Sequence, residues 1–473
     1  MMLEKILKSN AQVFLVFVAA SILLRFLSFH YSVIDHDEST YLIIADAVLN
    51  GSYLYADVID TKPPGIFLAF GLIQVLFGKS IVALRIVGSI FLAGSAWLLY
   101  KTSKLLSGEK YPSFFAGITY LVLFSLYRFG LSVNTELFFS FFTLVGLYYF
   151  LKKESSTKLY SWFLAGLFIG IAFIFKYTVL AGFGAFCIYF LIQSVQRKED
   201  VVRLIFKLFI ATIGLLLPFF LVNVYFFSVG RFGDFYEIIY MVTSRYSSTF
   251  SWTESFLFFL KFILAYIPFV VFYLFSFRNS KLPKNILLIS LLWFSFAWVM
   301  VILPGKPFRH YFLQLLPAFS LLIPYGFEKL ILTRIQFPNK KIIAFCLGII
   351  LVIGFVNQSY FLVSKDIPRE IAKELESVVN SNDLILADKH LHATYYLLDL
   401  KHPSPYVHPT LIHDHAKAFD INTEEEMDKI LDKEPKFIVY HKFASYFESH
   451  PRIQESYHFY SKIGKVTILE INS

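Results

Sequence analysis

The residues best suited to chemistry stand in two short polar stretches, Ile34–Tyr41 and Asp60–Gly65. The first contains an acidic pair that begins with Asp37, and the second contains Lys62 followed by two prolines. A carboxylate can take the proton from an attacking hydroxyl, and a cation can hold a departing phosphate. The two stretches therefore supply a base candidate, Asp37, and a phosphate-binding candidate, Lys62. The prolines limit the movement of the backbone beside the lysine.

Other charged and aromatic residues extend this set of candidates. A guanidinium fork is suited to bidentate contact with a phosphate, which makes Arg309 a further candidate. We assign contacts with a donor phosphate to Lys62, Arg309, Lys176 and Tyr311. We assign acceptor or supporting contacts to Glu136, Asp60, His310 and Arg245.

Each candidate also has a plain structural interpretation. Asp37 can simply cap a helix, and Lys62 can extend its side chain toward the membrane interface. Glu136 can pair with Arg128, and Lys176 can be an ordinary loop lysine. Charged groups near bilayer depth cost about 2–3 kcal/mol each, so several of them together favour a functional role.

The composition indicates a membrane protein with several spans. The 473 residues are 57% hydrophobic and only 16% charged, and they include 56 phenylalanines. These values lie far from those of a soluble domain. The net charge of +9 falls in short clusters between apolar runs. This distribution is typical of the positive-inside bias and argues against a nucleic-acid groove.

The apolar runs predict about eleven transmembrane helices, the first of which is retained and not cleaved as a signal. The expected spans are 11–30, 80–100, 112–127, 137–151, 160–175, 178–195, 207–229, 254–277, 285–303, 310–327 and 341–362. The run Ile66–Phe77 is too short to cross, so we expect an interfacial or re-entrant helix there. With this assignment, the basic loops fall on the side of Lys5 and Lys8, which places the N-terminus in the cytoplasm. All the candidate site residues then belong to loops or span ends on the opposite, outer face.

Two further segments complete the expected organisation. The first outer loop, about residues 31–79, should contain a helix capped by Asp37 that ends at Asn50-Gly51. After about Lys365 the composition becomes polar, with helix-like stretches at 367–380, 391–400 and 423–433. Strand-like stretches stand at 384–387, 437–440 and 466–471. We therefore expect a transmembrane domain over 1–364 and a small extracytoplasmic α/β domain over 365–473.

The polar tail is rich in histidine. Six of these residues are His390, His392, His402, His408, His413 and His415. The spacing of the pair at 413 and 415 suggests a metal site only loosely, and surface histidines are the favoured interpretation. No obligatory cofactor is expected, and dependence on a divalent metal ion stays open.

The first-loop motif resembles that of GT-C-fold glycosyltransferases. The similarity rests on Asp37-Glu38, Tyr41, Gly51, Tyr55, Asp57 and Asp60-x-Lys62-Pro63-Pro64. The closest group is the bacterial branch related to protein O-mannosyltransferases and to the lipid A aminoarabinose transferase. Polar motifs at Glu136, Lys176 and Arg309-His310-Tyr311 also stand where that group carries them. One departure is Thr61, where the aminoarabinose transferases place glutamate.

The resemblance implies an inverting transfer from a polyprenyl-phosphate sugar. Asp37 would act near the reacting centre, Glu38 would support it, and Lys62 would contact the phosphate. The expected protein is a hexosyl- or pentosyltransferase with an outer, periplasmic active site in a bacterial inner membrane. Its partners would be the lipid donor, membrane lipids and a glycan, lipid or protein acceptor, with no nucleic acid. The alternative hypothesis is a lipid or glycolipid flippase, but the ionisable residues lie at span ends and no repeated halves are visible.

Overall fold

The computed structural model describes residues 4, 6–152, 158–246, 250–305, 308–332, 348, 352–408, 410–441 and 444–472. The chain forms two compact units, each assembled from separate stretches of sequence. Unit 1 contains residues 1–29, 85–225 and 247–360. Unit 2 contains residues 30–84, 226–246 and 361–473, so the first polar loop belongs with the tail. The division at residue 365, which follows composition, stays a prediction.

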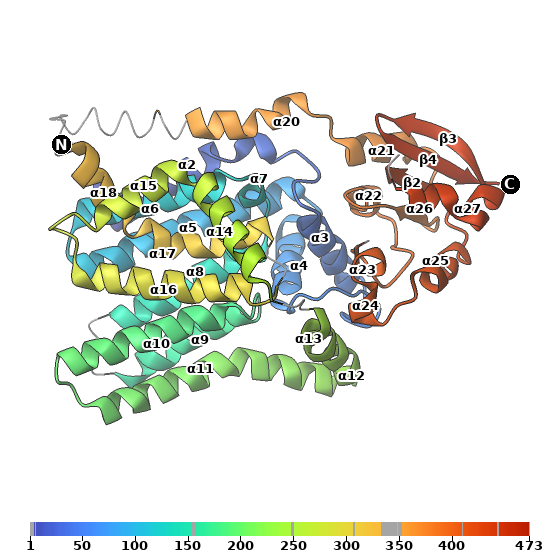
Figure 1. The fold of residues 1–473 in the computed structure, drawn as a ribbon. Coiled ribbons are helices and arrows are strands. Elements are labelled where there is room, and N and C mark those ends of the chain that lie inside the picture. Colours follow the sequence, from blue (N-terminus) through green and yellow to red (C-terminus); the bar gives the residue numbers. More distant parts are fainter. Residues whose placement is uncertain are drawn as a thin grey trace. The chain divides into compact units, whose positions relative to one another are not determined.

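Unit 1 is built from apolar helices (Figure 1). Its longer helices are α2 (Asn10–Leu23), α5 (Ile81–Ser107), α6 (Lys110–Ser125), α8 (Thr135–Leu151), α9 (Leu159–Phe173), α10 (Val179–Gln196), α11 (Val201–Ser228), α14 (Trp252–Ala265), α15 (Ile267–Ser276) and α16 (Lys284–Ile302). Its shorter helices are η1 (Phe26–Ser28), α7 (Arg128–Leu131), η4 (Arg309–Leu315), α17 (Leu316–Ser320), α18 (Ile323–Phe327) and η5 (Glu328–Leu332). The short helix α20 (Tyr360–Val363) begins at the last residue of unit 1 and continues into unit 2. The polytopic helical fold expected from the sequence is confirmed.

The helices of unit 1 follow most of the expected spans. Among the described residues, four helices are long and apolar enough to cross a membrane: α5, α10, α11 and α16. The number rises to five when α14 and α15, which meet at a 93° bend, form one broken span. The expected span 310–327 is likewise divided into short helices. Most of the expected span 341–362 lies outside the described residues.

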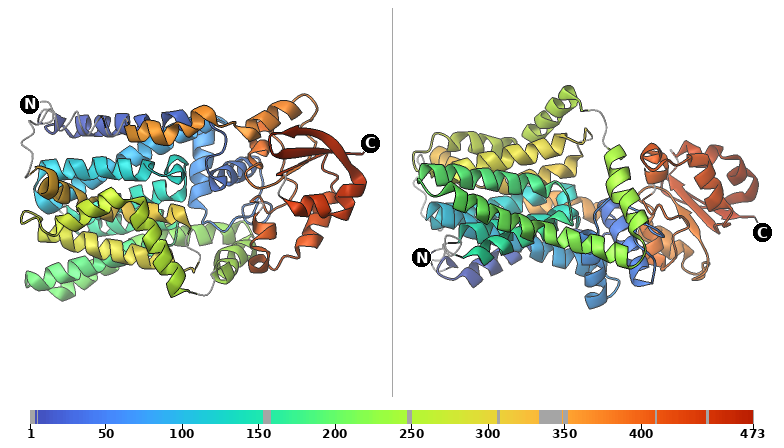
Figure 2. Two further views of the ribbon diagram at one scale, coloured as in Figure 1. Left: turned by 45° about the horizontal axis from the view of Figure 1, so that its top comes forward. Right: turned by 90° about the horizontal axis from the view of Figure 1, so that it is seen from below.

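Small residues allow α9 and α11 to approach closely. A Cβ atom on Gly166 of α9 would lie 1.8 Å from the Ala211 carbonyl oxygen of α11. A Cβ atom on Gly214 of α11 would lie 2.3 Å from the Phe163 carbonyl oxygen of α9. Only glycine fits at such backbone contacts, as is common between membrane helices. The long helix α11 runs without a break in both further views (Figure 2).

Unit 2 contains the helices of the first polar loop, a short helical segment and the tail. The helices before the tail are α3 (His36–Leu49), α4 (Gly65–Phe77), α12 (Phe232–Tyr236), η3 (Glu237–Val242) and α13 (Thr243–Tyr246). The helices of the tail are α21 (Ile367–Leu375), α22 (Ala393–Leu398), α23 (Thr410–His413), α24 (Ala416–Phe419), α25 (Thr423–Leu431), α26 (Ser445–Ser449) and α27 (Pro451–Ser456). The helix expected at 66–77 is present as α4.

The tail also forms one small mixed sheet, which confirms the expected α/β fold of this region. The strands are β1 (Ile385–Ala387), β2 (Phe437–His441), β3 (Tyr457–Ile463) and β4 (Val466–Ile471), in the spatial order β1-β2-β4-β3. β1 pairs parallel with β2, and β4 pairs antiparallel with both β2 and β3. Buried side chains from β2 and α25, including Ile438, Met427 and Ile430, form the core. β3 is an additional strand that the sequence pattern did not predict.

Backbone contacts join the first loop to the tail inside unit 2. Ile59 and Tyr406 form a parallel bridge, and the Ile59 N–H donates to the Pro405 carbonyl oxygen at 2.7 Å. Near the other end of the loop, the Ser32 N–H donates to Asp366 Oδ2 at 2.8 Å. Helix α3 packs against both α4 and α22. The polar loop is therefore held by the tail at several points.

Candidate active site

The first turn of α3 positions Asp37. The side chain of Asp35 caps this helix by accepting the Asp37 N–H at 3.3 Å. The expectation that Asp37 itself is the cap was therefore wrong, because the helix begins one residue before it. Asp37 and Glu38 lie in the first turn, where the helix dipole favours negative charge. The helix ends at Leu49, before Asn50-Gly51, as expected.

Both acidic side chains of this turn are largely shielded from solvent. The Asp37 side chain is 12% exposed, and Glu38 is 1% exposed. The Tyr41 hydroxyl, one helical turn along, donates to Asp37 Oδ2 at 3.3 Å. The carboxylate is thus held by its own helix and keeps a small exposed face.

Lys62 reaches Asp37 from the second polar stretch. Its Nζ lies 3.7 Å from Asp37 Oδ2 and 3.9 Å from Asp60 Oδ1. Its backbone N–H donates to Asp60 Oδ1 at 2.9 Å, and its carbonyl accepts from the Tyr55 hydroxyl at 2.7 Å. The structure therefore brings Asp37, Asp60 and Lys62 together. The sequence predicted this arrangement, because all three residues belong to the first polar loop. The role of each residue in a reaction stays a prediction.

Asp60 is the more deeply buried of the two carboxylates beside Lys62. Burial raises the pKa of Asp60, and the neighbouring Lys62 ammonium partly opposes this change. The negative charge of Asp37 raises the Asp60 pKa further. The Lys62 ammonium therefore lies near both carboxylates and offsets the repulsion between them. The attraction of both negative charges holds the ammonium in place.

Histidines line the other oxygen of Asp37. His36 Nε2 lies 3.9 Å and His408 Nε2 lies 3.7 Å from Asp37 Oδ1. One ring nitrogen of each histidine and one carboxylate oxygen of Asp37 all lie within 4.8 Å of one another. Burial is the main cause that lowers the pKa of His408 well below its ordinary value. The imidazole is therefore neutral near pH 7.

The interpretation of the tail histidines as surface residues was wrong for His392 and His408. His392 is 0% exposed and His408 is 6% exposed. His392 Nε2 lies 3.1 Å from Thr40 Oγ1 on α3, and the ring of the exposed His390 lies 4.8 Å from that of His36. The tail folds back on α3 and places these rings there. Sequence reasoning missed His36 and His408, although histidine enrichment in the tail was visible.

A second charged cluster lies in unit 1 around Glu136. This residue is the second of α8, is 1% exposed and accepts from Lys176 Nζ at 2.5 Å and from Thr135 Oγ1 at 3.1 Å. The Lys176 ammonium also lies 4.0 Å from the centre of the Tyr311 ring, a cation–π distance. The suggested pairing of Glu136 with Arg128 is replaced by the ion pair with Lys176. Arg128 instead stacks 4.3 Å from the ring of Tyr360.

The remaining candidates fall in two places. The His310 ring contacts that of Tyr311, with 4.6 Å between centroids, so this histidine joins the Glu136 cluster. Arg309 begins η4 beside it and is exposed. Arg245, in unit 2, is exposed and donates to Glu237 Oε1 at 3.0 Å.

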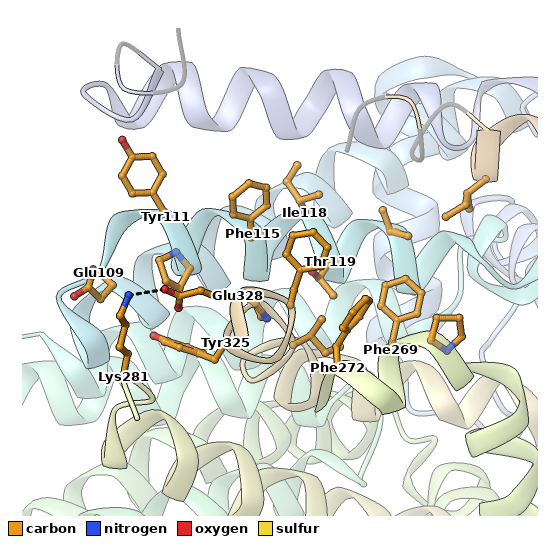
Figure 3. A pocket seen from close by; sticks show the side chains of 17 residues that line it. Glu109, Tyr111, Phe115, Ile118, Thr119, Phe269, Phe272, Lys281, Tyr325 and Glu328 are labelled. Atoms are coloured by element: carbon orange, nitrogen blue, oxygen red, sulfur yellow. Dashed lines mark hydrogen bonds and ion pairs between the residues drawn. The ribbon is translucent and has the colours of Figure 1, made fainter. Parts of the chain in front are cut away.

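Unit 1 also contains a cavity of about 890 Å³ between α6, α15 and α18. Aromatic and aliphatic side chains line most of it, and an ion pair between Lys281 and Glu328 lies at one end (Figure 3). None of the predicted site residues lines this cavity. It is an apolar space between helices, separate from the charged cluster of the same unit.

Comparison with known proteins relates this architecture to membrane glycosyltransferases. Residues 61–226, less than half of the chain, match the family described as dolichyl-phosphate-mannose-protein mannosyltransferase. ArnT from Cupriavidus metallidurans bound to undecaprenyl phosphate superimposes with a TM-score of 0.66 at 13% identity, covering 96% of this chain and 97% of that chain. The chain has the GT-C fold. The predicted relationship to protein O-mannosyltransferases and to ArnT is confirmed at this level.

More distant GT-C structures agree. An Archaeoglobus fulgidus oligosaccharyltransferase tethered to an acceptor peptide has a TM-score of 0.52 at 11% identity, covering 97% of this chain and 73% of that chain. The oligosaccharyltransferase AglB from the same organism, in complex with an inhibitory peptide and a dolichol-phosphate, has a TM-score of 0.51 at 11% identity and covers 97% and 74%. No curated protein matches the sequence. The GT-C fold therefore extends over nearly the whole chain.

Proposed function

We propose that this chain is a membrane glycosyltransferase that moves a sugar from a polyprenyl-phosphate donor to an acceptor hydroxyl. The observation that carries this proposal is the approach of Lys62 Nζ to within 3.7 Å of the shielded Asp37 carboxylate. A base and a phosphate-binding cation are the two groups that such a transfer needs. Here they lie in contact, although 25 positions separate them in the sequence.

The reaction is a single displacement that inverts the anomeric carbon. The acceptor oxygen forms a bond to the anomeric carbon, and its proton passes to the carboxylate of Asp37. The bond from that carbon to the phosphate oxygen breaks, and the electron pair stays on the phosphate. The ammonium of Lys62 offsets the charge that develops on the phosphate. Glu38 and Asp60 are assigned supporting roles, and Arg309 is assigned to the donor phosphate.

The nature of the donor is inferred from the relatives. Undecaprenyl phosphate is bound in ArnT, a dolichol-phosphate is bound in AglB, and the matched family is named for a dolichyl-phosphate sugar. We extend the shared element, a polyprenyl phosphate, to this chain. The basic loops favour a cytoplasmic N-terminus, which puts Asp37 on the outer, periplasmic face of a bacterial inner membrane.

The test is the variant Asp37→Asn in the purified chain, assayed for sugar transfer from polyprenyl-phosphate hexose and pentose donors. Loss of the base should lower the turnover at least about 100-fold, since general base catalysis contributes about 10²–10⁴-fold. Asp57→Asn is the matched control, because Asp57 is exposed and its carboxylate accepts only the Tyr53 N–H among the contacts described. This control should transfer sugar at the wild-type rate. Turnover of Asp37→Asn within a few-fold of wild type would end the assignment.

A further inference from the structure

The charged residues that line the apolar cavity of unit 1 all lie at one of its ends. They are Glu109, Lys281 and Glu328, and the hydroxyl of Tyr325 points toward the same end (Figure 3). Beyond that end the walls are mainly apolar, with side chains that include Phe115, Ile118, Val122, Phe269, Phe272 and Ile323. A space that is charged at one end and apolar along the rest matches the chemistry of an amphiphile.

Two carboxylates meet one ammonium at the charged end. Lys281 Nζ lies 2.8 Å from Glu328 Oε1, and Asn279 Nδ2 donates to the other carboxylate oxygen of Glu328 at 3.2 Å. The hydrogen bond to Glu328 raises the pKa of Lys281, and the negative charges of Glu328 and Glu109 raise it further. The Lys281 ammonium therefore stays protonated. A cationic group of a ligand finds a favourable place beside the two carboxylates, and an anionic group finds one beside the ammonium.

A buried hydroxyl at the same end lacks a hydrogen-bond partner. Tyr325 is 1% exposed, and its hydroxyl forms no hydrogen bond with any residue that the structure describes. Buried polar groups of folded proteins are nearly always hydrogen-bonded, because an unsatisfied group costs free energy. The Tyr325 hydroxyl is therefore placed to donate to an acceptor that enters the cavity, such as a phosphate oxygen.

We propose that this cavity binds a phospholipid of the phosphatidylethanolamine type, whose headgroup carries a phosphate and a primary ammonium. The phosphate accepts from the Lys281 ammonium and from the Tyr325 hydroxyl. The headgroup ammonium donates to Glu109 and Glu328, for which its three N–H groups suffice. A quaternary ammonium has no N–H group, so phosphatidylcholine lacks this contact. An acyl chain fills the apolar part and gives its walls the packing contacts that an empty space cannot supply.

The size and direction of the cavity suit an acyl chain. Its volume of about 890 Å³ lies within the roughly 300–1,000 Å³ that pockets for small molecules occupy. The lining residues of α6 extend from Tyr111 to Val122, which is about 16 Å of helix at a rise of 1.5 Å per residue. The sequence predicts that α6 spans the membrane, so a chain that lies along this helix runs in the same direction as the acyl chains of the bilayer.

This phospholipid is distinct from the sugar donor. The charged end of the cavity lies at the start of α6, whereas the cluster of Glu136 and Lys176 comes after the end of this helix, which is about 24 Å long. The loops that carry Glu109 and Lys281 are among the basic loops expected on the cytoplasmic side, and the candidate site residues are expected on the outer side. The headgroup therefore belongs to the cytoplasmic leaflet, and its binding does not rest on the proposed function.

The experiment identifies and counts the bound lipid. Lipids that stay with the full-length chain after purification in a mild detergent are extracted and identified by mass spectrometry. Delipidated chain is then titrated with phosphatidylethanolamine, phosphatidylcholine or phosphatidylglycerol in detergent micelles, and native mass spectrometry counts the molecules bound per chain. We expect one phosphatidylethanolamine per chain at saturation. It should bind at least about tenfold more tightly than the other two lipids, because each of them lacks a charge-assisted contact.

Variants test the two parts of the cavity separately. Lys281→Met and Glu109→Gln should each weaken the binding of phosphatidylethanolamine at least about tenfold, since each removes a charged contact with the headgroup. Lys284→Met is their control, because Lys284 is exposed and does not line the cavity. Ile118→Trp should abolish binding, because the larger ring takes up space that the acyl chain needs. Ile213→Trp, at a position of α11 that is 44% exposed, is the control for this change.

The outcomes separate this proposal from the proposed function. Wild-type chain that binds no phospholipid, or that binds the three lipids equally well, would overturn the lipid site. Lys281→Met and Glu109→Gln chains that bind like Lys284→Met would overturn it too. Displacement of phosphatidylethanolamine by an equal amount of a polyprenyl phosphate would make the cavity part of the donor site and likewise refute the proposal. A chain that binds phosphatidylethanolamine but transfers no sugar would keep the lipid site and refute the glycosyltransferase.

Discussion

The Lys62 ammonium is the most exposed member of the triad that it forms with Asp37 and Asp60. Its side chain is 24% exposed, against 12% and 3% for the two carboxylates. A ligand phosphate that enters from solvent therefore meets the lysine before it meets buried negative charge. The greater exposure of Lys62 than of Asp37 and Asp60 is consistent with a role of Lys62 in binding the donor phosphate.

Replacing this lysine should weaken donor binding. Lys62→Gln removes a charge-assisted contact of about 1.5–3 kcal/mol, which corresponds to a roughly 10- to 150-fold higher KM for the donor. Steady-state kinetics with a polyprenyl-phosphate sugar as the varied substrate measure this KM. Lys79→Gln is the control, since Lys79 is held by Asp46 at 2.9 Å and by Asp399 on the same unit. Equal KM values for the two variants would contradict the role of Lys62.

The buried ion pair of unit 1 makes a second prediction at this scale. Glu136→Gln leaves the Lys176 ammonium buried without its carboxylate, which should cost about 3–5 kcal/mol and lower the melting temperature in detergent. The double variant Glu136→Gln with Lys176→Met should recover most of that loss, since no unpaired charge remains. A double variant with the same melting temperature as Glu136→Gln would show that the unpaired Lys176 charge is not the cause of the lost stability.

The same double variant separates structure from chemistry. A double variant that melts like wild type and transfers sugar normally would show that Glu136 and Lys176 only stabilise the unit. Loss of transfer at normal stability would assign them to the reaction, in keeping with the donor-phosphate contact predicted for Lys176. Tyr311 should then be tested next, because the ammonium lies over its ring.

Single residues could be predicted from the sequence where the signal was local. Asp37 and Lys62 were recognised because charged side chains are rare in so apolar a chain, and they do meet. The helix cap was misassigned because Asp35 and Asp37 are chemically equivalent in the sequence. His408 was missed because its partners, Asp37 and His36, lie more than 350 positions away, and no spacing rule reaches that far.

At the scale of elements, close helix packing should be sensitive to a single methyl group. Gly166→Ala would place a Cβ atom 1.8 Å from the backbone oxygen of Ala211, so α9 and α11 must separate. Overpacking of this kind costs about 1–3 kcal/mol. Thermal unfolding of the purified chain should show a lower midpoint.

Gly233→Ala is the matched control, because nothing lies within 4 Å of a Cβ atom at that position. Its midpoint should stay at the wild-type value or rise slightly, since alanine restricts the unfolded chain. Equal midpoints for Gly166→Ala and Gly233→Ala would show that the two helices separate without cost.

Helices were predicted well and their breaks were not. The apolar run 254–277 was read as one span, but the chain bends by 93° at Tyr266, just before Pro268. A proline can begin a helix as easily as it can kink one, so the sequence alone does not decide between them. β3 was missed because most of its side chains are exposed or half-buried, which leaves no apolar alternation to detect.

At the scale of the whole molecule, the buried histidines should make unit 2 sensitive to acid. Burial lowers the pKa of His402 from its ordinary value of 6.5 to about 4, and it lowers the pKa of His392 and His408 as well. The unfolded chain therefore binds more protons than the folded chain between pH 6.5 and 4. Stability contributed by the neutral rings is present above pH 6.5 and is lost as the pH falls through this window.

Melting curves at pH 7.5, 6 and 5 test this behaviour. Between pH 7.5 and pH 5, His402→Gln should reduce the loss of stability by about 2 kcal/mol, because that residue no longer takes up a proton on unfolding. His458→Gln should keep the wild-type slope, since its ring is exposed on β3. The same slope in His402→Gln and wild type would contradict the prediction.

The assembly of unit 2 from separate stretches could not be predicted from composition. The change from apolar to polar residues near 365 is a change in amino-acid composition, and composition is a property of the local sequence. Which stretches fold together is decided by contacts such as the bridge between Ile59 and Tyr406. Such a contact has no local pattern, because each partner alone is an ordinary apolar or aromatic residue.

The pairing of Ile59 with residues near Pro405 has a consequence for biosynthesis. A ribosome exposes Asp37 and Lys62 early, but the strand partner of Ile59 emerges only after nearly the entire polypeptide has been made. A nascent chain interrupted before that point carries Asp37, Lys62 and His36 without the buried His408 of the tail. The full set of side chains around Asp37 is therefore assembled only after the tail has been made.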